Sequence, residues 1–176
     1  IFYAGTGLGF TGRLRGAGIW KSADGGTTWT QLTSTINDEF YFNQKIVVTS
    51  TSRVVVATND GLKVSDNGGD SWTDVISTIS MADVEVEDDG GSEGEVLFAS
   101  DFNGGIYKST DDGDNWTNIS PGDAGDRVEL AIAPSDVNTV YAVAASGTNV
   151  GWFKKSINGG STWSDITIPL YLEQGS

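Results

Sequence analysis

Two carboxylates are the side chains of this sequence that are best placed for catalysis. Asp60 and Asp101 follow two corresponding apolar runs, Arg53–Thr58 and Glu95–Ser100. Two carboxylates separated by about 6.5–9.5 Å hydrolyse a glycosidic bond with inversion, one as general acid and the other as general base. The competing interpretation is that both carboxylates only hold the backbone of a turn. The pair is therefore a weak catalytic candidate, and no catalytic residue is assigned.

Other charged and aromatic side chains suit ligand binding. The stretch Asp38–Phe42 joins three aromatic rings to two acids, and Gly7–Gly16 holds two of the four arginines. Rings stack on the apolar faces of sugars, while charged groups hydrogen-bond to hydroxyls. The competing interpretation is that Phe40 and Phe42 pack where the chain enters the next strand. The predicted binding residues are Arg13, Arg15, Tyr41, Asp60, Asp101 and Phe102.

These candidates lie between copies of one repeated stretch. Its clearest copy, Gly105–Ile119, alternates like a strand on both sides of a turn rich in Asp and Gly. Asp accepts backbone hydrogen bonds and Gly allows positive φ, so each copy predicts a hairpin. The tryptophans of successive copies are 43, 44 and 47 residues apart, which indicates a stacked or circular repeat fold. The other copies are Gly18–Leu32, Gly61–Val75 and Gly151–Ile166.

Each copy contains the pattern Ser-x-Asp/Asn-x-Gly-x-x-Trp, which resembles the Asp box, or BNR repeat, of sialidases, xyloglucanases and sortilin-like proteins. Two copies depart from the family pattern, because Asn67 and Asn158 replace the acid. A catalytic acid or an obligatory cation ligand would not tolerate this exchange, so the box is predicted to be structural. Its tryptophan ring, as at Trp116, is expected to be largely buried between sheets. The box residues are Ser22, Asp24, Gly26, Trp29, Ser65, Asn67, Gly69, Trp72, Ser109, Asp111, Gly113, Trp116, Ser156, Asn158, Gly160 and Trp163.

The resemblance implies an all-β fold, a β-propeller of four-stranded antiparallel blades with strands A to D from the inside outward. The Asp box then lies at the C–D turn, together with the A–B turns, and the B–C and D–A loops lie at the opposite end. About four blades fit the chain, and blade one lacks its innermost strand. The predicted blades of this single propeller domain or segment are 1–36, 37–80, 81–121 and 122–169, followed by a tail at 170–176.

An incomplete propeller needs something to complete it, because closed propellers have four to eight blades. Further blades, another chain or self-association are the expected solutions. Tyr171–Glu173 is a candidate closing strand for blade one. An uncovered strand edge would otherwise offer its backbone to other chains.

Composition excludes several classes of protein. Ten basic and 24 acidic residues give a net charge of −14, which disfavours nucleic acid and anionic membranes as partners. The absence of histidine removes the usual general base, and the absence of cysteine excludes disulfides and thiolate metal sites. No apolar run is long enough to span a membrane. Since no leader precedes Ile1, any signal peptide is expected to be already removed.

One acidic stretch could be considered for calcium. Glu85–Glu95 is rich in carboxylates, and calcium takes oxygen ligands. The stretch lacks the spacing of an EF-hand loop. A solvated A–B turn is therefore favoured, and neither a metal nor another cofactor is predicted.

Two functions remain open. The first is a non-enzymatic binding or scaffold module of an extracellular or periplasmic bacterial propeller, which recognises polysaccharide or protein through its B–C and D–A loops. The alternative is a segment of an inverting, xyloglucanase-like glycoside hydrolase whose catalytic carboxylates are partly outside this chain. Sialidase activity is not expected, since Arg13, Arg15, Arg53 and Arg127 make no convincing arginine triad.

Overall fold

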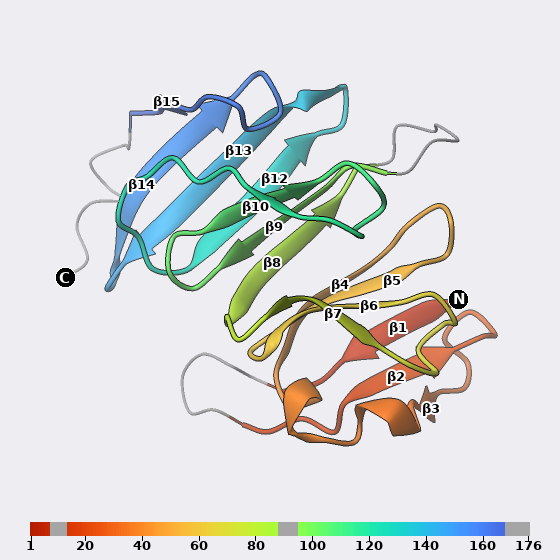
Figure 1. The fold of residues 1–176 in the computed structure, drawn as a ribbon. Helices are drawn as coiled ribbons and strands as arrows, with labels where there is room; N and C mark the ends of the chain where they lie inside the picture. Colours follow the sequence, from red (N-terminus) through yellow and green to blue (C-terminus); the bar gives the residue numbers. More distant parts are fainter. Residues whose placement is uncertain (8–13, 88–94, 168–176) are drawn as a thin grey trace. The chain divides into compact units, whose positions relative to one another are not determined.

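The computed structural model describes residues 1–7, 14–87 and 95–167 of the chain. Within these ranges it contains fifteen β-strands and two short 3-10 helices (Figure 1). No helix in the described part is long and apolar enough to cross a membrane. The strands form four antiparallel sheets, so the expected all-β architecture is confirmed.

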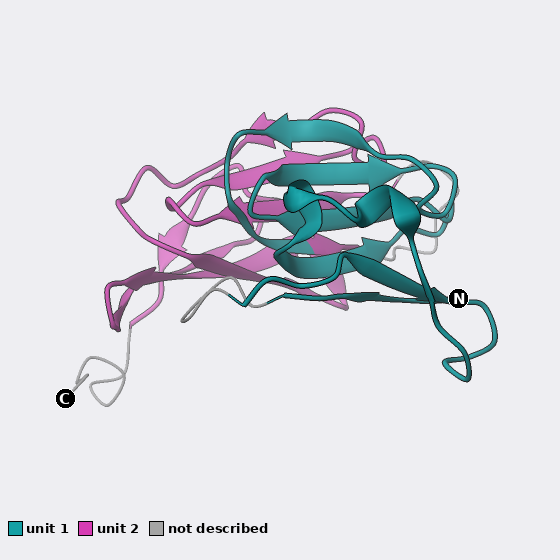
Figure 2. Ribbon diagram, turned by 90° about the horizontal axis from the view of Figure 1, so that it is seen from below, with its two compact units in different colours: residues 1–84 teal, residues 85–176 magenta. Residues whose placement is uncertain are grey.

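The chain divides into two compact units, Ile1–Val84 and Glu85–Ser176, which Figure 2 colours separately. Unit 1 begins with a three-stranded sheet in the order β1-β2-β3, which is the predicted blade one without strand A. A four-stranded sheet follows in the order β4-β5-β6-β7. The strands are β1 (Phe2–Gly5), β2 (Ile19–Ser22), β3 (Thr30–Gln31), β4 (Asn43–Val48), β5 (Val54–Thr58), β6 (Gly61–Ser65) and β7 (Thr73–Ser77).

The two remaining sheets also have four strands each, in the orders β11-β10-β9-β8 and β12-β13-β14-β15. The first of them begins with β8 at the boundary of the units, and its other strands belong to unit 2. These strands are β8 (Met81–Val86), β9 (Leu97–Asp101), β10 (Ile106–Ser109), β11 (Thr117–Asn118), β12 (Val128–Ala133), β13 (Asp136–Ser146), β14 (Asn149–Ser156) and β15 (Ser164–Asp165). The sheets fall within the four predicted blade ranges, and the assignment of one domain stays a prediction.

Each unit has an apolar core between its sheets, because alternate side chains of a strand face the same neighbour. In unit 1 this core joins Ile19 of β2 to Val56 of β5 and contains the buried ring of Phe40. In unit 2 Ile106 of β10 and Val140 of β13 belong to the equivalent core. Burial of such side chains is the main stabilising contribution to each unit.

The turns of the repeated Ser-x-Asp/Asn-x-Gly-x-x-Trp pattern, called boxes from here on, are held by one repeated set of hydrogen bonds. In the first box the Ser22 hydroxyl donates to Asp24 Oδ1 at 2.8 Å, and the same oxygen accepts from the Thr28 amide at 2.9 Å. Asn67 Oδ1 accepts the equivalent bonds from the Ser65 hydroxyl and the Ser71 amide. The acid and the amide therefore perform the same structural task, as the interpretation of the box requires.

The second side-chain atom distinguishes the two kinds of box. Asp24 Oδ2 accepts from the Thr28 hydroxyl at 2.6 Å, whereas Asn67 Nδ2 donates to the Ser71 hydroxyl at 2.8 Å. A hydroxyl can serve as donor or acceptor, so the turn accommodates both residue types. These hydrogen bonds, led by the one from the Thr28 side chain, lower the pKa of Asp24 to about 2.

The box tryptophans are partly buried, and Trp29 is the most exposed of the four. Trp116 is half-buried and Trp29 is 40% exposed. The expectation that the ring of Trp116 is buried is therefore met in part. Both rings turn towards their own hairpins, and their Nε1 groups donate to the carbonyls of Gly113 and Gly26.

Candidate binding site at the loop end of unit 1

The D–A loop of unit 1 folds into two 3-10 helices, η1 (Thr33–Thr35) and η2 (Asp38–Phe40), which the sequence did not predict. Asn37 caps η2, because its side-chain oxygen accepts from the Glu39 amide at 3.1 Å. The ring of Phe40 anchors the helix in the core, 5.2 Å from the ring centroid of Trp72. This agrees with the interpretation of Phe40 as a packing residue.

The loop lines a hollow of about 380 Å³ at the predicted ligand end of unit 1. Across the hollow lies the β5–β6 turn, whose Asn59 amide donates to the Phe42 carbonyl at 3.2 Å. The Asp60 amide donates to the Thr58 hydroxyl at 3.0 Å, and Asp60 is one of the residues that line the hollow. The lining residues are Asp38, Glu39, Phe42, Asn59 and Asp60.

A buried lysine stands behind this wall. Lys63 Nζ lies 3.2 Å from a Glu39 carboxylate oxygen and 3.7 Å from one of Asp60, and it also donates to Asp74. Burial lowers the pKa of Lys63, but the hydrogen bonds and charges of Asp74 and Glu39 outweigh it and raise the pKa above the usual lysine value. The amine therefore stays protonated and orients carboxylates, and it does not act as a nucleophile.

The predicted binding residues Arg15 and Tyr41 lie together in unit 1. The Arg15 guanidinium carbon is 5.1 Å from the centroid of the Tyr41 ring. The Gly16 amide donates to the Tyr41 carbonyl at 2.8 Å and so ties the B–C loop of blade one to the D–A loop. A side chain at Gly7 would collide with the same carbonyl, which requires glycine at this close approach. Arg13 lies outside the described residues.

The two candidates in unit 2 have local roles. The buried Asp101 accepts from the amides of Asn103 and Gly105 through Oδ1, and from the Tyr107 hydroxyl through Oδ2 at 2.9 Å. Burial, followed by the hydrogen bond to Asp101, raises the pKa of Tyr107 to about 12. Phe102 lies 5.9 Å below the Arg127 guanidinium. This geometry favours a structural role for Asp101, and its binding role stays a prediction.

Asp60 belongs to unit 1 and Asp101 to unit 2, and each is described only within its own unit. The predicted catalytic separation of these carboxylates therefore stays a prediction. Of the acidic stretch Glu85–Glu95, residues 88–94 lie outside the described part. Among the residues that are described, no group of acidic side chains is arranged to hold a metal ion.

Sequence reasoning missed Lys63 and its counterpart in unit 2, Lys154. The usable signal was a lysine two residues before the box serine in blades two and four. Such a lysine shares its sheet face with the core-facing serine. Each also pairs with an acid on the next strand, Asp74 in unit 1 and Asp165 in unit 2.

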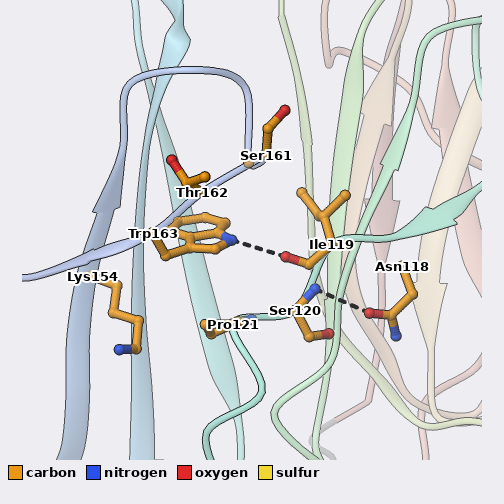
Figure 3. A pocket seen from close by; sticks show the side chains of 9 residues that line it. Asn118, Ile119, Ser120, Pro121, Lys154, Ser161, Thr162 and Trp163 are labelled. Carbon is orange, nitrogen blue, oxygen red and sulfur yellow. Dashed lines mark hydrogen bonds between the residues drawn. The ribbon is translucent and has the colours of Figure 1, made fainter.

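Unit 2 has its own hollow, of about 430 Å³, beside Lys154 and Trp163. Figure 3 shows the Trp163 indole directed at the Ile119 carbonyl, to which it donates at 2.9 Å. Lys154 Nζ lies 2.9 Å from an Asp123 carboxylate oxygen. The hydrogen bonds that the Lys154 ammonium donates to Asp165 and then to Asp123 raise the pKa of Lys154.

Comparison with known proteins identifies the fold class. No protein-family model and no curated protein matches the chain. Among solved structures, an ancestral GH74 enzyme matches with a TM-score of 0.71 and 24% identity, over 87% of this chain and 22% of that one. The GH74 xyloglucanase from Xanthomonas campestris matches with 0.62 and 21%, over 86% and 27%. A structure of YCF48 bound to D1 peptide matches with 0.59 and 17%, over 90% and 49%.

These neighbours and the four antiparallel sheets establish that the fold is a β-propeller built from four-stranded blades, about four of them in this chain. The chain spans less than half of the length of each of these solved structures. The likeness shows the fold, and function has to be argued from the site.

Proposed function

We propose that this chain is a non-enzymatic binding module whose ligand occupies the hollow at the loop end of unit 1. The observation that carries the proposal is the lining of that hollow, which combines three carboxylates with the ring of Phe42. Concave sites with a few convergent polar groups are the usual binding sites of proteins. Loops that differ from blade to blade are also where a repeated frame normally carries recognition.

The charges favour a basic polypeptide segment as the ligand. Asp38, Glu39 and Asp60 line the hollow, and Lys63 supplies one positive charge behind them. The excess of carboxylate suits a lysine or arginine side chain, and the Arg15–Tyr41 pair offers a neighbouring aromatic surface. The net charge of −14 would add long-range attraction for such a partner. A neutral polysaccharide, stacked on Phe42 and Tyr41, is the competing ligand.

Binding to peptide and glycan arrays, followed by titration of the best ligand at two salt concentrations, tests the proposal. A basic peptide should bind and lose affinity as salt rises, because screening weakens exposed charge pairs. Asp60→Asn and Tyr41→Ala should weaken binding about tenfold while the melting temperature falls by no more than a few degrees. Glycan binding that does not depend on salt would favour the polysaccharide as the ligand. If both variants bound their ligand as tightly as the wild type, the proposed site would be contradicted.

For the glycoside-hydrolase alternative, an inverting enzyme segment, Asp60 is the member of the predicted carboxylate pair that lines the described hollow. Because both oxygens of Asp101 are engaged in its own hairpin, a partner carboxylate would have to come from elsewhere. Release of reducing sugar from xyloglucan that is lost in Asp60→Asn would support this alternative. An extracellular or periplasmic location remains part of the proposal and is tested by fractionating the source cells.

A further inference from the structure

The two units contain the same junction between neighbouring sheets. In unit 1, Lys21 Nζ lies 5.6 Å from the centroid of the Tyr3 ring and donates to the Gly68 carbonyl at 2.8 Å. In unit 2, Lys108 Nζ lies 5.4 Å from the Phe98 ring and donates to the Gly159 carbonyl at 3.2 Å. Each lysine immediately precedes its box serine, and each glycine follows the next box serine by three residues.

A second contact closes both junctions. Leu32 lies against Gly69, where an added Cβ would collide with Leu32 Cδ1. Ile119 lies against Gly160 in the same way. The backbone amides of Leu32 and Ile119 donate to strand carbonyls at 2.9 and 2.8 Å, so both side chains are fixed at the end of strand D. Each junction thus has two contacts. A lysine that lies over an aromatic ring bonds to one glycine of the next box, and an aliphatic side chain packs against the following glycine.

The last sheet of the chain carries the lysine half of this junction. Lys155 precedes the box Ser156, and its Nζ lies 5.4 Å from the Tyr141 ring. The Ile166 amide donates to the Phe153 carbonyl at 2.7 Å, as Leu32 and Ile119 do in their blades. Among the described residues of unit 2, Lys155 Nζ has no hydrogen-bond partner. A hollow of about 330 Å³ on this face is lined mostly by apolar residues, among them Tyr141 and Phe153.

The first sheet carries the glycine half. Of the described residues of unit 1, none places an atom within 4 Å of an added Cβ at Gly25, the counterpart of Gly68 and Gly159. At Gly26 the nearest neighbours are Phe2 and Trp29 of the same sheet, at 3.6 and 3.9 Å. Phe2 is 54% exposed, whereas the residues at its position in blades two and four, Val54 and Val140, are fully buried.

We propose that the β12–β15 sheet of one copy of this chain binds the β1–β3 sheet of a second copy. In this contact Lys155 Nζ donates to the Gly25 carbonyl, and Ile166 packs against Gly26. Phe2 and Trp29 of the second copy cover the apolar hollow between Tyr141 and Phe153. A second copy is the occupant to which the observations point, because one chain presents both complementary halves of a junction that it already makes twice. The contact is head-to-tail, since different surfaces meet.

Sedimentation of the 176-residue chain over a range of concentrations tests the association. Self-association should weaken at least tenfold in Lys155→Glu, which sets a carboxylate against the Gly25 carbonyl, and in Phe2→Lys, which places a charge in the apolar contact. Ile36→Lys is the matched control: Ile36 is 56% exposed, as Phe2 is, but it lies outside the proposed surface. Circular dichroism shows whether each variant folds. If Lys155→Glu fails to fold, Lys155→Met, which removes only the donor, replaces it.

A mixing experiment separates head-to-tail contact from other modes. Lys155→Glu and Phe2→Lys should each be monomeric alone, while an equimolar mixture should form a one-to-one dimer through the single intact junction. A wild-type chain that stays monomeric at all concentrations would overturn the proposal. Association that survives both substitutions, or that the mixture does not restore, would also overturn it.

Discussion

The two units have the same junction between neighbouring sheets, but different side chains pack beside its tryptophan. In unit 1 the D–A loop folds into η1 and η2, and Phe40 packs on Trp72, whose Nε1 donates to the Ser34 hydroxyl. In unit 2 the equivalent Trp163 donates to the Ile119 carbonyl and borders an open hollow. The tryptophan, the lysine and the glycines of the junction therefore recur in both units. The D–A loop differs between the units, and in unit 1 it packs the Phe40 ring beside the tryptophan.

The largest expected difference between the units is the loss of stability when a side chain beside this tryptophan is truncated. Phe40→Ala should lower the free energy of unfolding by about 3–5 kcal/mol, because it removes a fully buried ring from the core of unit 1. Pro121→Ala at the hollow of unit 2 should change it by less than about 1 kcal/mol, since that site is open. Urea unfolding followed by circular dichroism measures both. Equal losses would show that the two junctions are filled alike.

The buried lysines give a smaller difference. Lys63→Met should cost about 2 kcal/mol, since it leaves three half-exposed carboxylates facing one another. Lys154→Met should lower the free energy of unfolding by about 1 kcal/mol, because Lys154 has only two carboxylate partners among the described residues and these are on average more exposed than those of Lys63. Thermal unfolding of both variants measures the order, and a costlier Lys154 substitution would contradict it.

The pH dependence of these lysines follows from their raised pKa values. A raised folded pKa gives stability that is fully present below the unfolded lysine pKa of about 10.4 and is lost as pH rises through the folded value. Wild type should therefore lose stability above about pH 10.5 more steeply than a Lys63→Met, Lys154→Met double variant. Identical alkaline slopes would contradict the charge assignment.

The boxes provide the smallest effect. Asp111→Asn should lower the melting temperature by no more than a few degrees, because Asn67 and Asn158 already make the same turn hydrogen bonds. If this substitution abolished ligand binding in a stable protein, the structural assignment of the box would be wrong.

Titration separates the two kinds of box. The pKa of Asp24 lies at about 2, below its ordinary value of 3.8, so its contribution to stability is present above pH 3.8 and is lost as pH falls towards 2. In Asp24→Asn this acid-dependent loss should be reduced. Titration of the Asp24 carboxyl carbon by NMR measures the pKa directly, and a value near 4 would contradict the proposed hydrogen bonds.

The sequence predicted the repeated part of the molecule well. The hairpins and the equivalence of Asp and Asn in the box follow from local patterns that recur four times. The three strands of the first sheet follow from comparing the first copy with the other three. The D–A loop of unit 1 was not predictable in the same way, because η1 and η2 occur once and depend on tertiary contacts of Phe40 and Ser34. The half-buried state of Trp116 also depends on its neighbours, which its own pattern does not specify.

Some of the residues that lie at this candidate site were predicted from the sequence, and their role in binding stays a prediction. Arg15 and Tyr41 pair as a binding surface would require, and Asp60 lines the hollow. Glu39 and Lys63 were not predicted as site residues. Glu39 lies in a stretch whose aromatic residues gave the stronger signal for binding, and Lys63 lies in a largely apolar strand. Asp101 looked equivalent to Asp60 by position, yet its burial gives it different hydrogen-bond partners.

The most direct test of the central claim is an NMR titration of the isotopically labelled chain with the best peptide or glycan from the arrays. We predict that the backbone signals that shift most belong to Glu39, Tyr41, Asn59 and Asp60, around the hollow of unit 1. The shifts should disappear in Asp60→Asn at the same ligand concentration. Shifts concentrated instead on Asp24, Asp111 or the Glu85–Glu95 stretch would place the ligand at the box end and contradict the account.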